Sequence, residues 1–312
     1  MHINPLTGFK IFNPLAVKKT ILLFLLVAFL KSNAQVVTYS YDSDVFIKLQ
    51  KSTLYVVLTD NPTYDSAITK AATNYWKVTP FEFINMKDIN TVIDDENNSF
   101  LAPFLWEKTI KHGLNEKYKD YTSINSWLWV INGGRKKLAN YSVTDVICLA
   151  AFNYGGDEHD YVAASYRLDY MVKAINDGIQ LVADEKIYGS FMNMPSRVFE
   201  KINKNTTAIL KTKTLIINRE TKLWDSNKNL VDSTIFKEAK YPYKYEYVSN
   251  ERFKELMAGT SSEFLLLVPA VEANKHISIY DPATRNTVYS GFAMLGLKVT
   301  KGDIEDIMDG KR

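Results

Sequence analysis

The chain has 312 residues, with 38 Lys and Arg, 35 Asp and Glu, and 46% hydrophobic residues. This composition is typical of a globular protein and excludes a disordered chain, a collagen-like repeat, a coiled-coil rod and a multi-span membrane protein. One cysteine, Cys148, excludes an intramolecular disulfide and a cysteine-based structural zinc site. The apolar neighbours of Cys148 predict a buried thiol rather than a catalytic nucleophile.

Residues 1–34 differ from the rest because they contain four lysines and no acidic residue. Lys18 and Lys19 precede a ten-residue apolar run, Ile21 to Leu30, which is shorter than a membrane-spanning helix requires. Ser32-Asn33-Ala34 then places small residues at positions −3 and −1 of a cut before Gln35. These features predict a cleavable secretory signal and an exported protein, periplasmic or extracellular, with an uncleaved anchor as the alternative.

Loss of the leader lowers the number of basic residues from 38 to 34 against 35 acidic ones. The mature chain is therefore close to neutral, and no long basic run follows residue 34. Because nucleic acids and anionic lipids attract clustered positive charge, we expect no nucleic acid as a partner. We also expect no transmembrane helix in the mature chain.

The first half of the mature chain alternates strand and helix signals. Its first strand is β-branched and apolar, and Asp60-Asn61-Pro62 ends it in a turn. The expected elements are a strand at 51–58, a helix at 64–76, a strand at 80–84, a short helix capped by Asn85, a strand from 99, and a hairpin of strands at 126–131 and 145–152.

The second half repeats this order, which is the most informative feature of the sequence. Its expected elements are a strand at 213–217, a helix at 231–240, a strand at 244–248, a short helix capped by Ser249, a strand from 264, and a hairpin of strands at 276–280 and 288–295. From Phe81 to Leu101 we align the repeat at a constant offset of 164 residues, which pairs Leu101 with Leu265.

These patterns predict an α/β fold of two similar strand-helix-strand-helix halves, each with an added β-hairpin, joined by a helical bridge. The expected divisions are a signal peptide at 1–34, a first α/β half at 35–160, a helical bridge at 161–210, and a second α/β half, a pseudo-repeat of the first, at 211–312.

One local cluster of acidic residues follows two glycines and consists of Asp157, Glu158, His159 and Asp160. Oxygen ligands on a flexible loop are suited to Ca²⁺, but the alternating spacing of a calcium-binding loop is missing. A solvated loop before a helix explains the cluster equally simply. We keep these four residues as weak binding candidates and expect no metal site and no cofactor.

Signatures of the common catalytic sites are missing from the sequence. The histidines after the leader, His112, His159 and His276, have no metal-ligand spacing, and we expect them to lie at the surface or to be hydrogen-bonded in the interior. No nucleophile elbow, dinucleotide-binding glycine motif or phosphate-binding loop occurs. Residues 59–62, directly after the first strand, contain no glycine that would let a phosphate approach. The catalytic residues, if any, stay unknown.

Aromatic residues alternate along one expected strand at Tyr241, Tyr243, Tyr245 and Tyr247, and so share one face. They suit a platform for sugars or peptides, but the repeat places Tyr245 and Tyr247 where Phe81 and Phe83 stand, which favours core packing. The same interpretation applies to Trp127 and Trp129. Glu82 and Glu246 form the one identical charged pair of the alignment, on the opposite, solvent-facing side.

Three stretches resemble secreted proteins of Bacteroidota-type bacteria. They are the leader ending in Ser-Asn-Ala-Gln, Tyr-Trp-Lys-Val-Thr-Pro-Phe-Glu-Phe at 75–83, and Tyr-Pro-Tyr-Lys-Tyr-Glu at 241–246. The resemblance covers most of the mature chain and implies no activity.

Export, repetition and the missing catalytic signatures favour a non-enzymatic binding or assembly module of the cell envelope. Its partner would be an envelope protein, a polymer or a small ligand, bound in a cleft between the two halves. The alternative is a hydrolase acting on envelope glycan or peptide, with two carboxylates, or a carboxylate and a histidine, converging in a pocket. A structural subunit of a larger assembly is a third possibility.

Overall fold

The computed structural model describes residues 37–38, 42–110, 121–141, 145–151, 162, 165–188, 194–219, 235–271, 274–294 and 299–311. The expected signal peptide and its alternative, an uncleaved anchor, lie outside these residues. Within the described ranges, no helix combines the length and the apolar character needed to cross a membrane.

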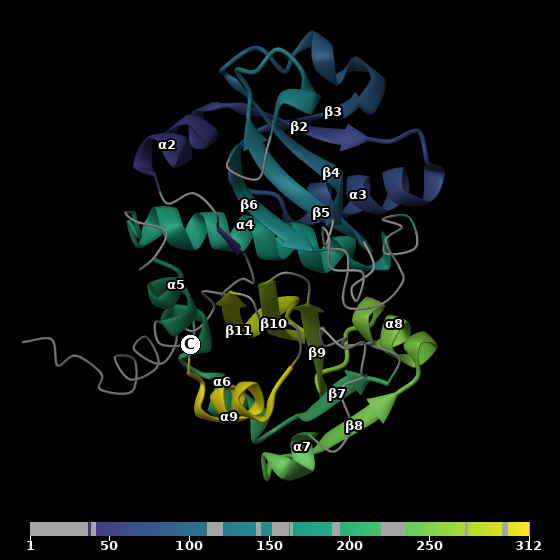
Figure 1. Ribbon diagram of the computed structural model, residues 1–312, viewed down its shortest axis with the longest axis vertical. Helices are drawn as coiled ribbons and strands as arrows, with labels where there is room; N and C mark the ends of the chain where they lie inside the picture. The colour runs from purple at the N-terminus through teal and green to yellow at the C-terminus, as the bar shows by residue number, and fades with distance from the viewer. Residues whose placement is uncertain are drawn as a thin grey trace, which may run out of the picture. The chain divides into compact units, whose positions relative to one another are not determined.

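The first half forms a mixed sheet with the strand order β1-β6-β5-β4-β2-β3 (Figure 1). Its elements are β1 (Val37–Thr38), α2 (Ser43–Lys51), β2 (Thr53–Leu58), α3 (Pro62–Tyr75), β3 (Phe81–Asn85), the 3-10 helix η1 (Met86–Thr91), β4 (Asn98–Ile110), β5 (Tyr121–Asn132), the 3-10 helix η2 (Leu138–Asn140) and β6 (Val146–Ala151). Strands β2, β3 and β4 are parallel, whereas β5 and β6 continue antiparallel. Asn61 caps α3 by accepting two backbone N–H groups, and Pro62 opens the first turn.

The second half forms a sheet with the strand order β11-β10-β9-β7-β8. Its elements are β7 (Thr214–Asn218), α7 (Ile235–Glu238), β8 (Tyr245–Val248), α8 (Asn250–Ala258), β9 (Phe264–Val271), β10 (Asn274–Asp281), β11 (Asn286–Met294) and α9 (Lys301–Asp309). The 3-10 helix η4 (Ser165–Arg167), α4 (Leu168–Asp184), α5 (Met194–Asn203) and α6 (Thr206–Leu210) lie between the two sheets in the sequence. Helix α9 begins with a capping box of Thr300 and Asp303.

The two sheets share one topology. Strands β2 to β6 correspond in order and direction to β7 to β11, which confirms the predicted α/β fold of two similar halves. Both halves also have a register irregularity at the same step, between Val130 and Ile131 in β5 and between Ile279 and Tyr280 in β10. Bulges alter the local twist of a strand and are specific features rather than defects. The cut points at 160/161 and 210/211 remain a prediction.

The constant offset of 164 residues is wrong at the third strand. Tyr55 pairs with Glu82 and Phe100, and Ile216 pairs with Glu246 and Leu266. Glu82 and Glu246 therefore correspond as predicted, but Phe100 corresponds to Leu266, an offset of 166. The reason lies in the connections, because the first half uses the short 3-10 helix η1 where the second half has the longer α8.

The two halves turn opposite faces towards the same central layer of helices. In the first sheet, Leu54 and Val56 of β2 belong to the large core that contains α3 and α4. In the second sheet, Ile216 of β7 joins that core, whereas its neighbours Leu215 and Ile217 face a separate core with α7 and α9. Successive residues of a strand point to opposite faces of the sheet. The face of the first sheet that packs on α4 therefore corresponds to the face of the second sheet that points away from α4, and the two halves do not pack symmetrically face to face.

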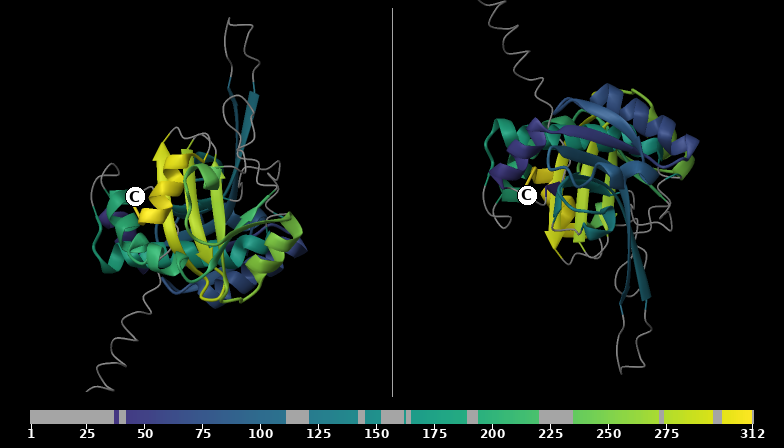
Figure 2. Two further views of the ribbon diagram at one scale, coloured as in Figure 1. Left: turned by 90° about the horizontal axis from the view of Figure 1, so that it is seen from below. Right: turned by 90° about the horizontal axis from the view of Figure 1, so that it is seen from above.

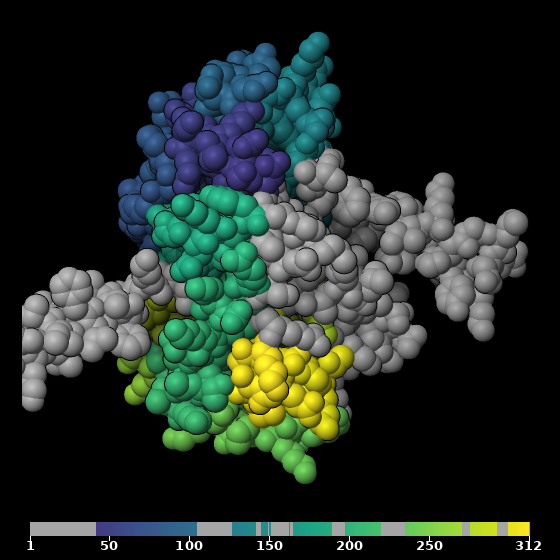
Figure 3. All heavy atoms as spheres, turned by 90° about the vertical axis from the view of Figure 1, so that its left-hand side faces the viewer, coloured from purple at the N-terminus to yellow at the C-terminus, as the bar shows by residue number. Residues whose placement is uncertain are grey.

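Helix α4 fills the boundary between the two sheets. Its Tyr170 is buried and lies 4.6 Å, ring centroid to ring centroid, from the buried Tyr280 of β10. Figure 3 shows α2, the region of α4 and α5, and α9 following one another over one face. The expected cleft between the halves is thus replaced, among the described residues, by a packed apolar core.

Candidate functional site

The β4–β5 hairpin is much longer than the sheet that contains it. Its strands pair from Ser99↔Asn132 to Ile110↔Tyr121, whereas β2 pairs with β4 only as far as Leu101 and β6 pairs with β5 only from Trp127. Residues 105–110 and 121–126 form a two-stranded projection, here called the ribbon (Figure 2). In the described part of the chain, no further strand pairs with the ribbon.

The outer edge of β4 can be read from the hydrogen bonds at its start. Thr53 N donates to Asn97 O on the β2 side, and Gly133 N donates to Asn98 O on the β5 side. Backbone groups alternate along a strand, so the odd-numbered residues of β4 direct their N–H and C=O groups towards the β2 side. The β2–β4 pairing ends at Leu101, and the next residue on that edge, Pro103, has no N–H to donate.

The chain after β2 turns away from this edge. Thr59 N donates to Asp65 Oδ1 in α3 at 2.8 Å, and Asp60 adopts a left-handed backbone conformation with φ of 62°. From Leu105 outward, the N–H and C=O groups of every second residue of β4 therefore lie on an open edge among the described residues.

An aromatic stack supports the base of the ribbon. The ring of Phe104 lies 3.7 Å, centroid to centroid, from the ring of Trp129 and 6.4 Å from that of Trp127. Trp129 is fully buried, and its indole Nε1 has no hydrogen-bond partner among the described residues. Such aromatic contacts contribute about 0.5–1.5 kcal/mol each beyond their buried area. The predicted core role of Trp127 and Trp129 agrees with this burial.

Two glycines, Gly133 and Gly134, fix the other end of the hairpin, where β4 begins and β5 ends. Gly133 N donates to Asn98 O at 2.7 Å and Gly134 N donates to Ile93 O at 2.8 Å. A Cβ on Gly133 would lie 2.2 Å from Asp95 O, and Gly134 has a φ of +113°. Neither position accommodates a larger residue without a backbone shift.

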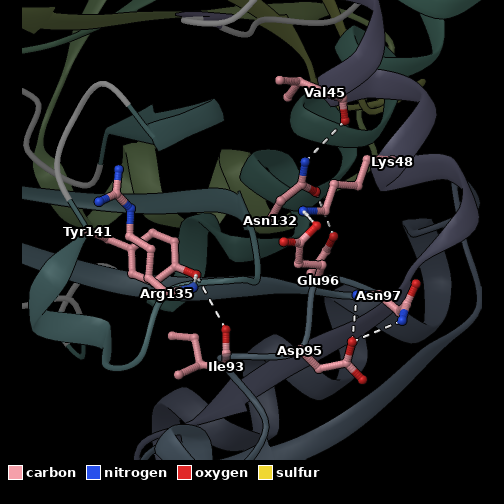
Figure 4. Close-up of polar contacts among 10 residues, drawn as sticks. Val45, Lys48, Ile93, Asp95, Glu96, Asn97, Asn132, Arg135 and Tyr141 are labelled. Atoms are coloured by element: carbon pink, nitrogen blue, oxygen red, sulfur yellow. Dashed lines mark hydrogen bonds and ion pairs between the residues drawn. The ribbon is translucent and has the colours of Figure 1, made fainter.

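Polar side chains tie this end to the rest of the first half. Ser99 Oγ donates to Asn132 Oδ1 at 2.9 Å, and Asn132 Nδ2 donates to the carbonyl of Val45 in α2 at 3.2 Å. Tyr141 Oη accepts from Arg135 N and contacts the carbonyl of Ile93 (Figure 4). Burial raises the pKa of Tyr141, although the hydrogen bond from Arg135 lowers it. These groups satisfy one another, so they form an anchor rather than a ligand site.

The four acidic-cluster candidates, Asp157, Glu158, His159 and Asp160, lie outside the described residues, as does His112. Among the residues that the structure describes, no group of three or more His, Cys, Asp or Glu side chains is arranged to hold a metal ion. Cys148 is buried, as its apolar neighbours predict.

His276 is buried in β10 and belongs to a polar joint with α5. Its Nε2 lies 3.1 Å from Ser290 Oγ, and Asn203 makes two hydrogen bonds to the backbone of Ser290. Burial lowers the pKa of His276 to about 4, so the imidazole is neutral at physiological pH. A histidine that contacts a serine can activate the serine hydroxyl as a nucleophile. Ser290 is fully buried, however, so a substrate cannot reach its hydroxyl. The joint holds α5 on β11.

The alternating tyrosines Tyr241, Tyr243, Tyr245 and Tyr247 belong to the core around Phe236 of α7, and the last two lie in β8. Tyr245 stacks on Phe236 at 5.1 Å, whereas Tyr241 and Tyr247 meet that ring edge-on. Tyr241 is buried and the other three tyrosines are half-buried, so core packing dominates here. Glu82 and Glu246 are both exposed, as predicted. Phe83 is exposed as well, so its predicted place in the core is wrong.

Sequence reasoning missed the ribbon because its length is not marked by any motif. The one available signal was Pro103, which matches Pro269 only at an offset of 166 residues. No known family model, curated protein or solved structure matches this chain, so its function is inferred from its own residues and contacts.

Proposed function

We propose that this protein is an exported, non-enzymatic binding or assembly module of the cell envelope, and that the ribbon is its contact element. The observation that carries the proposal is the difference between the two repeats. Strands β4 and β5 have 13 and 12 residues, whereas the corresponding β9 and β10 have 8 each. The second half completes the same topology without a ribbon, so the fold itself does not require one.

The energetics of the ribbon support the same role. An isolated two-stranded hairpin is marginally stable in water, because its few cross-strand contacts barely offset the entropy of ordering the chain. Here the Phe104–Trp129 stack fixes the hairpin where the ribbon leaves the sheet, and Gly133 fixes its other end, where β4 begins and β5 ends. A firmly mounted projection loses less entropy when it binds than a free loop does.

The place of action follows from the leader. The basic start, the short apolar run and the small residues before Gln35 support export to the periplasm or the cell exterior. The near-neutral mature chain favours a partner recognised by shape and backbone pairing over one attracted by charge.

The test is a ribbon-shortened variant in which an Asn-Gly turn replaces residues 105–126. Phe104 and Trp127 are directly opposite each other, on the side of β4 that bonds to β5, so a two-residue turn can close the hairpin there. We expect the free energy of unfolding to change by less than about 1 kcal/mol, since a long connection is removed. When the native envelope is crosslinked, the shortened variant should no longer form adducts with the partner.

A photo-crosslinking residue placed at Thr109 reports on the ribbon, and one placed at the exposed Glu246 in β8 is the matched control. Adducts at Thr109 and none at Glu246 support the proposal. A shortened variant that no longer folds, or adducts that are equally abundant at both positions, would assign the ribbon a structural role instead.

A further inference from the structure

We propose that the open edge of β4, from Leu105 outward, receives an extended strand of a partner protein and that the ribbon thereby becomes a three-stranded sheet. This inference rests on the proposed function, because it names the kind of partner that the ribbon takes. Strand addition of this sort gains its affinity from main-chain hydrogen bonds.

The groups on the edge define the chemistry of the partner. Leu105, Glu107 and Thr109 alternate with the residues that bond to β5, so their N–H and C=O groups lie on the open side. The same alternation spaces these donor and acceptor sets about 6.8 Å apart, twice the rise per strand residue. A second extended main chain is the ligand that matches this spacing with both donors and acceptors.

Pro103 sets where the added strand begins. In the β2–β4 ladder, the N–H of residue 103 would have been the next donor after Leu101, and proline supplies none. The partner strand therefore pairs from Leu105, beyond the end of β2, and lies in the plane of the ribbon. The three available residues on the edge fit a strand of about five to seven residues, a usual strand length.

The repeat provides an internal comparison. Pro269 stands at the same step of the β7–β9 ladder, two residues after Leu267. Only Ala270 and Val271 follow Pro269 before β9 ends. Strand β11 pairs with β10 along its whole length, including Asn274, the first residue of β10, so β10 does not extend beyond its neighbour. Beyond the proline, the second half has one further edge residue, Val271, whereas the first half has three, Leu105, Glu107 and Thr109.

Three of the registers in which a second copy of the same edge could pair with the first carry a cost. Symmetric antiparallel pairing centred on Glu107 would place that residue opposite its own copy, and pairing centred on Lys108 would do the same with lysine. Like charges directly opposite each other are destabilising. Pairing centred on Trp106 would set Pro103 opposite Thr109 and lose a donor. A partner strand of different sequence avoids all three costs.

The experiment removes one hydrogen-bond donor from the edge. Glu107→Pro deletes an outward N–H without touching the β4–β5 ladder, as Pro103 already does four residues earlier on the same edge. Glu107→Ala is the matched control, because it removes the charge but keeps the N–H. Lys108→Pro is the disruptive control, because its N–H faces β5.

All three variants are made in the full chain, leader included, with the photo-crosslinking residue at Thr109, and adducts are measured in the native envelope. We expect Glu107→Pro to lower the adduct yield at least tenfold with an unchanged melting temperature, and Glu107→Ala to retain the yield. Lys108→Pro should lose the adducts together with the order of the ribbon.

Each other outcome has a distinct meaning. Adducts that survive Glu107→Pro as well as Glu107→Ala overturn strand addition but leave the ribbon as the contact element. Adducts to another copy of this chain overturn the partner strand in favour of self-association. The absence of any adduct at Thr109 in the unmodified protein overturns both this inference and the proposed function.

Discussion

Pro103 and Pro269 occupy the same position in two parallel strand pairs. Pro103 lies two residues beyond Leu101, the last residue of β4 that pairs with β2, and Pro269 lies two residues beyond Leu267, the last residue of β9 that pairs with β7. At that step the edge lacks a donor in both halves, so pairing with β2 and β7 ends there. Beyond the proline the two halves differ, because only the first half continues into a ribbon.

Replacing Gly133 should destabilise the protein strongly. A Cβ at this position would meet the backbone carbonyl oxygen of Asp95 at 2.2 Å, and a backbone atom cannot move aside as a side chain can. We expect Gly133→Ala to cost about 2–3 kcal/mol, the upper part of the range for overpacked interior sites. Gly302→Ala in α9 is the control, since its nearest neighbour is a side-chain oxygen 3.7 Å away. Urea unfolding should show the first variant destabilised and the second unchanged or slightly stabilised.

Acid should weaken the fold through His276. Its pKa is lowered to about 4 in the folded state, against about 6.5 in an unfolded chain, so the unfolded state binds the proton more readily. Stability is therefore complete above pH 6.5 and falls as the pH drops towards 4, by up to about 3 kcal/mol. The measurement is urea unfolding between pH 7.5 and 4.5 for the unmodified protein and His276→Gln.

The His276→Gln variant separates this histidine from the carboxylates that also titrate at low pH. Its unfolding free energy should decline less steeply between pH 6.5 and pH 4.5 than that of the unmodified protein. Identical slopes would mean that the His276 side chain is accessible to protons without unfolding.

Breaking the buried ion pair between Lys275 and Asp303 should cost about 3–5 kcal/mol, because one charge stays in the interior. Both side chains are less than one-tenth exposed, and Asp303 also accepts from Thr300 in the capping box of α9. Lys275→Met is the test, measured as a shift of the thermal midpoint. The exposed pair of Lys301 and Glu305 in the same helix is the control, and Lys301→Met should change stability by less than about 1 kcal/mol.

Arg285 should prove important for holding the β10–β11 turn against α8. Its guanidinium donates to the carbonyls of Met257 and Ala258 and to Tyr280 Oη, at 2.7 to 3.0 Å. Its φ of 59° lies in the left-handed region, which glycine adopts without strain. We expect Arg285→Ala to destabilise by about 2–3 kcal/mol and Arg285→Gly by about 1 kcal/mol less. Equal losses for the two variants would argue against backbone strain at this turn.

Local signals predicted the elements well where short-range chemistry decides them. Ser249 caps α8, as the sequence indicates. Helix α3 begins at Pro62 with Asn61 as its cap, two residues before the predicted start at 64, so part of the predicted turn belongs to the helix. The short helix after Asn85 differed, because it is the 3-10 helix η1 without a side-chain cap. That difference shortened the connection to β4 by two residues and misplaced the alignment at Leu101. A shift of two keeps every side chain on its face, so hydrophobic patterning could not reveal it.

The candidate site was less predictable. The sequence pattern placed a strand at 126–131 and another from 99, but β5 begins at Tyr121 and β4 ends at Ile110. The alternation of residues along a strand does not show whether another strand pairs with its edge. Only the register with β2 and β6 shows where the flanking strands stop.

The sequence by itself determined the repeated order of strands and helices, because apolar periodicity and capping residues act over a few positions and recur in both halves. It also determined that Cys148 is interior. The tertiary structure alone decided that the repeats turn opposite faces towards α4, that Pro103 and Pro269 coincide, and that one hairpin outgrows its sheet. These features depend on contacts between residues distant in the chain, such as Leu54 and Ile216 in one core, which no local pattern specifies.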